Sequence, residues 1–388
     1  MRVKVFTILC TILMCCFSAG ALHARYIHVA TWGTAAGSPY ATLEQGIQAA
    51  NASPGIDDIR VHSGVYTLPV SGVQIMEECK ITAHAGGTVN VYIPGPFGHL
   101  SVRNTDAQFN SIEFRCSAGG YGQTAVVGTG SDARIHFMDC RFNNFPRTPV
   151  QGRGCNRVDV KFCSFSDNAG FNGGAMRVVG VEEVFVEDCK FSWKSTVGEG
   201  GAIYLVDCTI ATIYRSWLCD NSAANQGGAV FVDTVGDLEL RNDVISGTFS
   251  LQEGGGIRFQ NTGSSPLTAG RRLTIRMDVV NCTIFDNLSM SSGGGLSVQP
   301  IVVIPRCYTH LVNSILWNNT ANAWLKLVSQ SDVPPNHVDD CCIEGWGGRR
   351  QLYRNRCDCT QPSVERKRRV EILFSLYQSG RSIAFSKC

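Results

Sequence analysis

The sequence has no apolar run long enough to cross a membrane as a helix. Its most apolar segment, residues 5–17, is too short for that purpose, and no later segment is apolar enough. H-E-x-x-H and G-x-S-x-G motifs are also missing, and the eight histidines are scattered. These absences exclude the zinc proteases and α/β-hydrolases that carry such motifs.

Glycine pairs are the clearest pattern that is present. They open short apolar runs such as GGAIYLVD (200–207) and GGAVFVD (227–233). Because the glycines precede the strand-like run, the pattern does not fit a phosphate-binding loop, in which they follow a strand. The first four pairs recur at one constant interval, and the gap before the last pair is longer. The leading glycines are Gly173, Gly200, Gly227, Gly254 and Gly293.

A period of about 27 residues without helical periodicity predicts one coil of a parallel β-helix per repeat. Each corner then recurs directly above itself, and glycine tolerates the positive φ that such a corner needs. A second, Asn-rich corner recurs in the same region, and its amides are expected to stack as a hydrogen-bonded ladder. The corner asparagines are Asn168, Asn221, Asn287 and Asn319. We therefore predict an all-β fold, a right-handed parallel β-helix of roughly ten or eleven coils.

The apolar alternation after each glycine pair predicts which side chains fill the interior. The residue three positions after each leading glycine, and the residue two positions further on, are expected to point inward. These residues are Met176, Ile203, Val230, Ile257, Leu296, Val178, Leu205, Val232, Phe259 and Val298.

The alternating GGAI-type and F-x-x-N-type tetrapeptides resemble the repeats of the chlamydial polymorphic outer-membrane proteins and related secreted bacterial right-handed β-helix proteins. The stretch YATLEQGIQAANASPGIDDIRVHSGVYTL (40–68) is similar to the opening of pectate-lyase-like β-helices. That likeness implies a short capping helix and first coil within residues 25–70, and a β-helix over 25–320. It implies little about activity, because this fold hosts lyases, hydrolases, adhesins and inert stalks.

Residues 1–24 have the pattern of a secretory signal peptide. A basic start at Arg2 and Lys4 precedes the apolar segment, and a small-residue exit predicts cleavage after Ala21 or Ala24. We therefore expect an exported protein that is secreted or exposed at the cell surface.

Fifteen of the 18 cysteines follow this peptide, so they cannot all pair with one another. Four occupy the same position of the repeat, where a small buried apolar residue is expected, and this favours a ladder of free thiols in the interior. Disulfide bridges are the alternative. These four are Cys140, Cys163, Cys189 and Cys282. A late group lacks the C-x₂₋₄-C spacing of zinc sites, so no metal is expected there. It consists of Cys341, Cys342, Cys357 and Cys359.

Residues 321–388 are predicted to form a Cys-containing basic tail. From Arg349 onward it has ten Lys and Arg against three Asp and Glu. The run ERKRR (365–369) is interpreted as a solvated tail, and nucleic acid is not an expected partner. After CIEGWGG (342–348) neither corner pattern continues, so the segment is a loosely packed tail, a cap for the last coil or an out-of-frame stretch.

Signals for catalysis are weak, and the catalytic residues stay unknown. NTD at 104–106 resembles the start of a polygalacturonase signature, but Ala107 follows it and the remaining elements of the signature are missing. Asn104 and Asp106 are therefore interpreted as corner residues. The outward positions from Phe185 and Glu187 onward show no stack of carboxylates for a calcium-dependent lyase.

One outward column is a candidate binding surface. Its members are predicted to face solvent on one sheet, where aromatic rings can stack on sugars and arginine can bind carboxylates. Stacked aromatics also stabilise solenoid faces without any ligand, and this alternative stays open. The column consists of Arg177, Tyr204, Phe231 and Arg258.

These observations favour a non-catalytic, adhesin-like binding protein. The expected partner is a glycan or another host or cell-surface component, with no cofactor. The alternative is a polysaccharide lyase or glycoside hydrolase acting on a uronate polymer, and only that alternative involves calcium.

Overall fold

The structure is a computed structural model that describes residues 25–31, 40–95, 97–116, 123–262, 275–299, 307–321, 328–330, 337–339 and 341–343. The expected signal peptide at 1–24 and the segment from residue 349 onward lie outside the described residues. So do Cys357 and Cys359.

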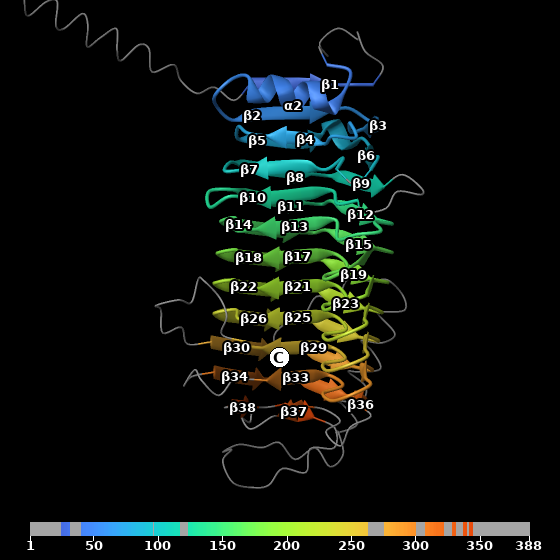
Figure 1. Cartoon of the computed structure of the whole chain (residues 1–388), viewed down its shortest axis with the longest axis vertical. Helices are drawn as coiled ribbons and strands as arrows, with labels where there is room; N and C mark the ends of the chain where they lie inside the picture. The colour runs from blue at the N-terminus through green and yellow to red at the C-terminus, as the bar shows by residue number, and fades with distance from the viewer. Residues whose placement is uncertain are drawn as a thin grey trace, which may run out of the picture.

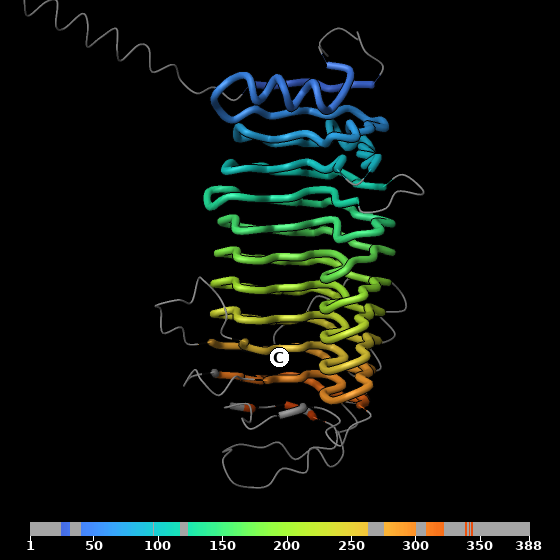
Figure 2. The backbone as a smooth tube through the Cα atoms, in the orientation of Figure 1, coloured from blue at the N-terminus to red at the C-terminus, as the bar shows by residue number. Residues whose placement is uncertain are grey.

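The described strands form four parallel sheets of 12, 10, 11 and 6 strands, which wind together as a stack of coils along the long axis (Figure 1). The tube trace shows each coil lying directly on the preceding one (Figure 2). This arrangement confirms the predicted all-β right-handed parallel β-helix, and the sheet sizes agree with roughly ten or eleven coils.

The 12-stranded sheet consists of β1 (Arg25–Val29), β2 (Asp57–Val61), β5 (Cys79–Ala83), β8 (Asp106–Asn110), β11 (Arg134–Met138), β14 (Arg157–Lys161), β18 (Glu183–Glu187), β22 (Ile210–Tyr214), β26 (Asp237–Arg241), β30 (Ile275–Val280), β34 (Cys307–Val312) and β38 (His337–Asp339). The 10-stranded sheet consists of β4 (Val73–Ile75), β7 (Leu100–Arg103), β10 (Val126–Thr129), β13 (Val150–Arg153), β17 (Met176–Val179), β21 (Ile203–Val206), β25 (Val230–Asp233), β29 (Ile257–Gln260), β33 (Leu296–Gln299) and β37 (Val328–Gln330).

The 11-stranded sheet consists of β3 (Gly64–Thr67), β6 (Val89–Ile93), β9 (Ile112–Cys116), β12 (Arg141–Asn143), β15 (Ser164–Ser166), β19 (Lys190–Ser192), β23 (Trp217–Cys219), β27 (Val244–Ser246), β31 (Thr283–Phe285), β35 (Ile315–Trp317) and β39 (Cys342–Ile343). The 6-stranded sheet consists of β16 (Ala169–Gly170), β20 (Ser195–Thr196), β24 (Ser222–Ala223), β28 (Phe249–Ser250), β32 (Leu288–Ser289) and β36 (Thr320–Ala321). A short 3₁₀ turn, η1 (His84–Gly86), follows β5.

The helix α2 (Leu43–Asn51) lies at the N-terminal end of the stack (Figure 1). Thr42 caps it, because its hydroxyl accepts a hydrogen bond from the Gln45 backbone N–H at 3.2 Å. The apolar face of α2, which includes Leu43 and Ile47, is buried against β1, β2 and β4. The predicted capping helix is therefore present. No helix among the described residues has the length and apolar character needed to span a membrane.

The interior contains the side chains that the alternation predicts. Met176, Ile203, Val230 and Ile257 pair in register on successive strands, and all ten predicted inward side chains are at most 4% exposed. Phenylalanine rings stack between coils, with ring centroids 4.7 Å apart for one pair. Stacking of this kind stabilises the core and fixes the register of the coils.

The leading glycines have backbone conformations that L side chains rarely adopt. All five have φ between 66° and 70°. At Gly227 a Cβ atom would lie 2.5 Å from the carbonyl oxygen of Val230, so the corner excludes side chains on steric grounds as well.

The corner asparagines are buried, but they do not form the expected continuous amide ladder. Lys194 and Thr248 occupy the intervening coils, because the first three asparagines are two coils apart in the sequence. Each amide instead bonds to backbone groups of the neighbouring coil, as when Asn221 Oδ1 accepts from the Lys194 N–H at 3.2 Å. Of the four, only Asn287 and Asn319 bond amide to amide, at 2.9 Å.

The predicted cysteine step belongs to a longer buried column, which we call the thiol–hydroxyl column. Between most neighbours the backbone N–H of one member donates to the side-chain sulfur or oxygen of the next, as from Cys140 to Cys163 Sγ at 3.3 Å. The cysteines in it are unbridged. The column consists of Cys140, Cys163, Cys189, Ser216, Asp243, Cys282, Ser314 and Cys341.

Candidate functional site

The predicted outward column lies on the 10-stranded sheet, with one residue on each of β17, β21, β25 and β29. The rings of Tyr204 and Phe231 stack with centroids 5.2 Å apart and planes inclined by 9°. The guanidinium carbon of Arg177 lies 5.6 Å from the centroid of the Tyr204 ring. The four side chains are therefore neighbours, as their spacing predicts.

The prediction that this column faces solvent is wrong for Phe231 and Arg258, which are 4% and 2% exposed. The guanidinium of Arg258 pairs with Glu253 at 2.5 Å and donates to Ser297 Oγ at 2.6 Å. Burial lowers the pKa of Arg258, and Glu253 opposes that shift. The Arg258 side chain thus forms internal contacts, and only Arg177 and Tyr204 are partly accessible.

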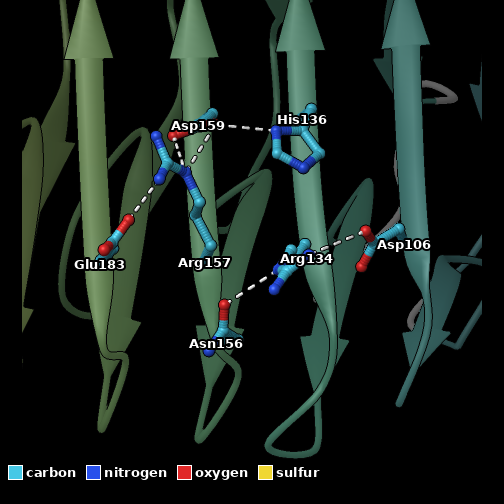
Figure 3. Close-up of a pocket in the computed structure, with 7 residues that line it drawn as sticks. All are labelled: Asp106, Arg134, His136, Asn156, Arg157, Asp159 and Glu183. Atoms are coloured by element: carbon cyan, nitrogen blue, oxygen red, sulfur yellow. Dashed lines mark hydrogen bonds and ion pairs between the residues drawn. The ribbon is translucent and has the colours of Figure 1, made fainter.

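A different cluster lies on the outer face of the 12-stranded sheet. Seven polar residues from neighbouring coils line a shallow depression of about 350 Å³, which we call the polar depression (Figure 3). Strands β8, β11, β14 and β18 or their immediate starts supply all of them. The lining residues are Asp106, Arg134, His136, Asn156, Arg157, Asp159 and Glu183.

Asp159 is the centre of the network in this depression. Its carboxylate accepts from His136 Nδ1 at 2.8 Å and from Arg157 Nε at 2.8 Å, and Arg157 also pairs with Glu183 on the next strand (Figure 3). Burial raises the pKa of Asp159, but the hydrogen bonds from His136 and Arg157 outweigh burial and leave that pKa below its ordinary value. The hydrogen bond that Arg157 donates to Asp159 raises the pKa of Arg157. The carboxylate and guanidinium are therefore charged and fixed in orientation.

On the other side of the depression, Arg134 links Asn156 to Asp106. Its Nε donates to Asn156 Oδ1 at 3.0 Å, and its Nη1 lies 3.5 Å from Asp106 Oδ2. Asp106 is the first residue of β8, so its interpretation as a corner residue is wrong. Asn104, by contrast, has the positive φ of a corner, at 52°.

An aromatic ring adjoins this network. Phe185 lies beside Asp159 on the neighbouring strand β18 and is partly exposed. Lys161 Nζ lies 4.8 Å from the centroid of its ring. The outer face of the sheet thus combines planar polar groups with an aromatic ring, the two surfaces that sugars contact.

The sequence did not predict this cluster because the coils there differ in length from the period of the glycine pairs. His136 and Asp159 are neighbours on adjacent strands at a sequence separation of only 23. The outward positions from Phe185 and Glu187 onward lie one coil beyond Asp159, so that column of residues does not include the cluster. The signal that could have predicted the cluster is the register of the strands, because it aligns His136, Asp159 and Phe185.

Within the described stretches, no three His, Cys, Asp or Glu side chains are arranged to hold a metal ion. The chemistry that the polar depression supports directly is hydrogen bonding from fixed donors and acceptors. His136 adds one titratable ring, held by a carboxylate at Nδ1.

The family model for the right handed beta helix region matches residues 98–284. This span includes every residue of the polar depression. No curated protein and no solved structure matches the chain. The matched span and the stacked coils make this chain a parallel β-helix repeat protein.

Proposed function

We propose that the protein is an exported, adhesin-like β-helix that binds a glycan on the outer face of its 12-stranded sheet. The observation that supports this most strongly is the preformed network of His136, Arg157 and Asp159 in the polar depression. Sugar hydroxyls both donate and accept hydrogen bonds, so they suit a surface where charged donors and acceptors are already oriented. Fixing these groups before binding reduces the entropy that association costs.

The neighbouring ring of Phe185 supports the same proposal. It lies one coil from Asp159, so a sugar in the depression could place a second ring against it. This assignment moves the candidate surface away from the Arg177 column, because Phe231 and Arg258 in that column are buried. Tyr204 and Arg177 keep a secondary role in the proposal as accessible neighbours on the adjoining sheet.

A second function has one specific observation in its favour. His136 is held by Asp159 through Nδ1, and a carboxylate-held imidazole is an arrangement that general bases use. A polysaccharide lyase or glycoside hydrolase acting on a uronate polymer is therefore the alternative, and calcium would have a role only in the lyase. Binding without turnover is preferred because both Arg157 and Asp159 are already engaged with each other.

The location and partners form part of the same proposal. We place the protein outside the cell or on its surface, with a glycan or another cell-surface component as partner. No cofactor and no nucleic acid have a role in it.

The proposal is tested with a glycan array followed by calorimetry on the bound sugars. Arg157→Gln should weaken binding at least about tenfold, because it removes a charge-assisted donor. The matched control is Arg115→Gln, which also breaks a pair with a carboxylate two residues away on the same strand, Glu113, but on the 11-stranded sheet. Binding to no glycan, or equal effects of both variants, contradicts the proposal. Reducing ends or unsaturated products that vanish in His136→Ala would support the enzymatic alternative.

A further inference from the structure

The outer face of the 12-stranded sheet contains a second cluster with the same chemistry as the polar depression. Asp278 on β30 accepts from Arg276 Nε at 2.9 Å and lies 3.1 Å from Nδ1 of His310 on β34. In the polar depression Asp159 likewise binds the arginine two residues before it and a histidine on an adjacent strand. We call the two clusters the first station, centred on Asp159, and the second station, centred on Asp278.

The two stations lie in the same columns of the sheet. Strand register aligns Arg157 with Arg276 and Asp159 with Asp278 through the strands between them. The stations are four strand steps apart, which corresponds to about 19 Å at about 4.8 Å per step. Their order is reversed, since the histidine precedes the aspartate along the stack in one station and follows it in the other. The aspartate column reads His136, Asp159, Phe185, Thr212, Glu239, Asp278 and His310.

The charge of this face limits what it can bind. The five strands from β14 to β30 present four basic and six acidic outward side chains, a net charge of −2. The basic ones are Arg157, Lys161, Arg241 and Arg276, and the acidic ones are Asp159, Glu183, Glu187, Asp237, Glu239 and Asp278. A polymer of uronates would meet net repulsion here, whereas an uncharged sugar chain would not.

We infer that the ligand of this face is a linear, uncharged glycan that contacts the Asp159 and Asp278 stations at the same time. This inference rests on the proposed glycan-binding function and specifies its ligand. A polymer repeats the same hydroxyl groups along its length, so two similar stations can bind two of its units. A separation of about 19 Å is spanned by several pyranose rings in a row but not by a disaccharide.

A second copy of the chain is a less suitable occupant of this face. Turned end for end, it would place Asp159 of one copy opposite Asp278 of the other, and Arg157 opposite Arg276. Like charges facing each other disfavour that contact. The repeated stations therefore favour a repeating ligand over self-association.

The experiment measures affinity against chain length. Disaccharides and hexasaccharides of β-1,4-linked glucose, mannose and N-acetylglucosamine are compared with oligogalacturonates of the same two lengths. The best neutral hexasaccharide should bind about 100-fold more tightly than its disaccharide, because the second contact is intramolecular. Its affinity should not depend on salt, since no net charge is neutralised.

The variants assign this length effect to the stations. Arg276→Gln should weaken hexasaccharide binding about tenfold and leave disaccharide binding at the first station unchanged, with Arg115→Gln as the control. Equal affinity for both lengths, or tighter binding of oligogalacturonates, would overturn the inference while leaving glycan binding in place. Failure of every sugar to bind would overturn the proposed function as well.

Discussion

Replacing Asp243 with serine should stabilise the protein at neutral pH. Asp243 is a member of the thiol–hydroxyl column and is 1% exposed. Its Oδ1 accepts the backbone N–H of Ser216 at 2.7 Å, while its Oδ2 is buried without a hydrogen-bond partner. Serine or cysteine fills this position on other coils, so one acceptor atom is all that the column requires.

The size of the effect follows from proton linkage. Burial raises the pKa of Asp243 well above its ordinary value, and the hydrogen bonds from the Ser216 and Arg241 backbones only partly oppose this. The folded state therefore holds a proton that the unfolded chain releases above its pKa of about 3.9. The contribution of Asp243 to stability is greatest below about pH 4 and falls by about 1.4 kcal/mol per pH unit until the folded pKa is reached.

Urea denaturation at a series of pH values measures this contribution. The free energy of unfolding of Asp243→Ser minus that of the wild type should increase by about 2.7 kcal/mol over two pH units within the window. Asp243→Asn removes the titrating group but keeps its shape, and should show the same pH trend. Asp237→Ser, which changes an exposed aspartate on the same coil, should show none. A difference that does not vary with pH, or a less stable serine variant at neutral pH, would refute this reasoning.

Four further substitutions test the fold and the corrected column. Gly227→Val should lower the free energy of unfolding by about 2 kcal/mol or more, because φ is 68° and the carbonyl oxygen of Val230 lies only 2.5 Å from the Cβ position; an unchanged melting temperature contradicts this account. Leu205→Asp should abolish folding by burying an unpaired charge, whereas Tyr204→Asp should leave a folded protein. Similar circular dichroism spectra for the two variants would show that the assignment of inward and outward positions on this strand is wrong. Arg258→Met should destabilise by about 2 kcal/mol in thermal melts, because the buried Ser297 hydroxyl loses its donor and Glu253 loses its cationic partner. A neutral effect would mean that Arg258 is effectively solvated.

The sequence predicted the fold because its strongest signals are local and repeated. The glycine at position 227 is required by a positive φ, and the alternation at Ile203 and Leu205 fixes the inward face. Both constraints act within one coil and recur in the next, so a single period reveals them. The same reasoning identified Tyr204 and Phe231 as stacked neighbours.

The candidate site was harder to predict because it depends on register between coils of unequal length. The sequence separation is 23 between His136 and Asp159, and it is 28 between Asp106 and Arg134. The fixed period of the glycine pairs misaligns both of these contacts. The burial of Arg258 was missed for a related reason, since Glu253 and Ser297 on the next coil bind its guanidinium in addition to Gln260 on its own strand.

The stacked coils make distance along this molecule change in fixed increments. Met176 pairs with Ile203, and Ile203 with Val230, so removing residues 203–229 would bring Met176 against Val230 with the pairing pattern intact. The two aspartates of the stations would then lie one step, about 4.8 Å, closer together. Loss or duplication of single coils would therefore change the distance between the two stations in steps of this size and leave the residues of each station unchanged.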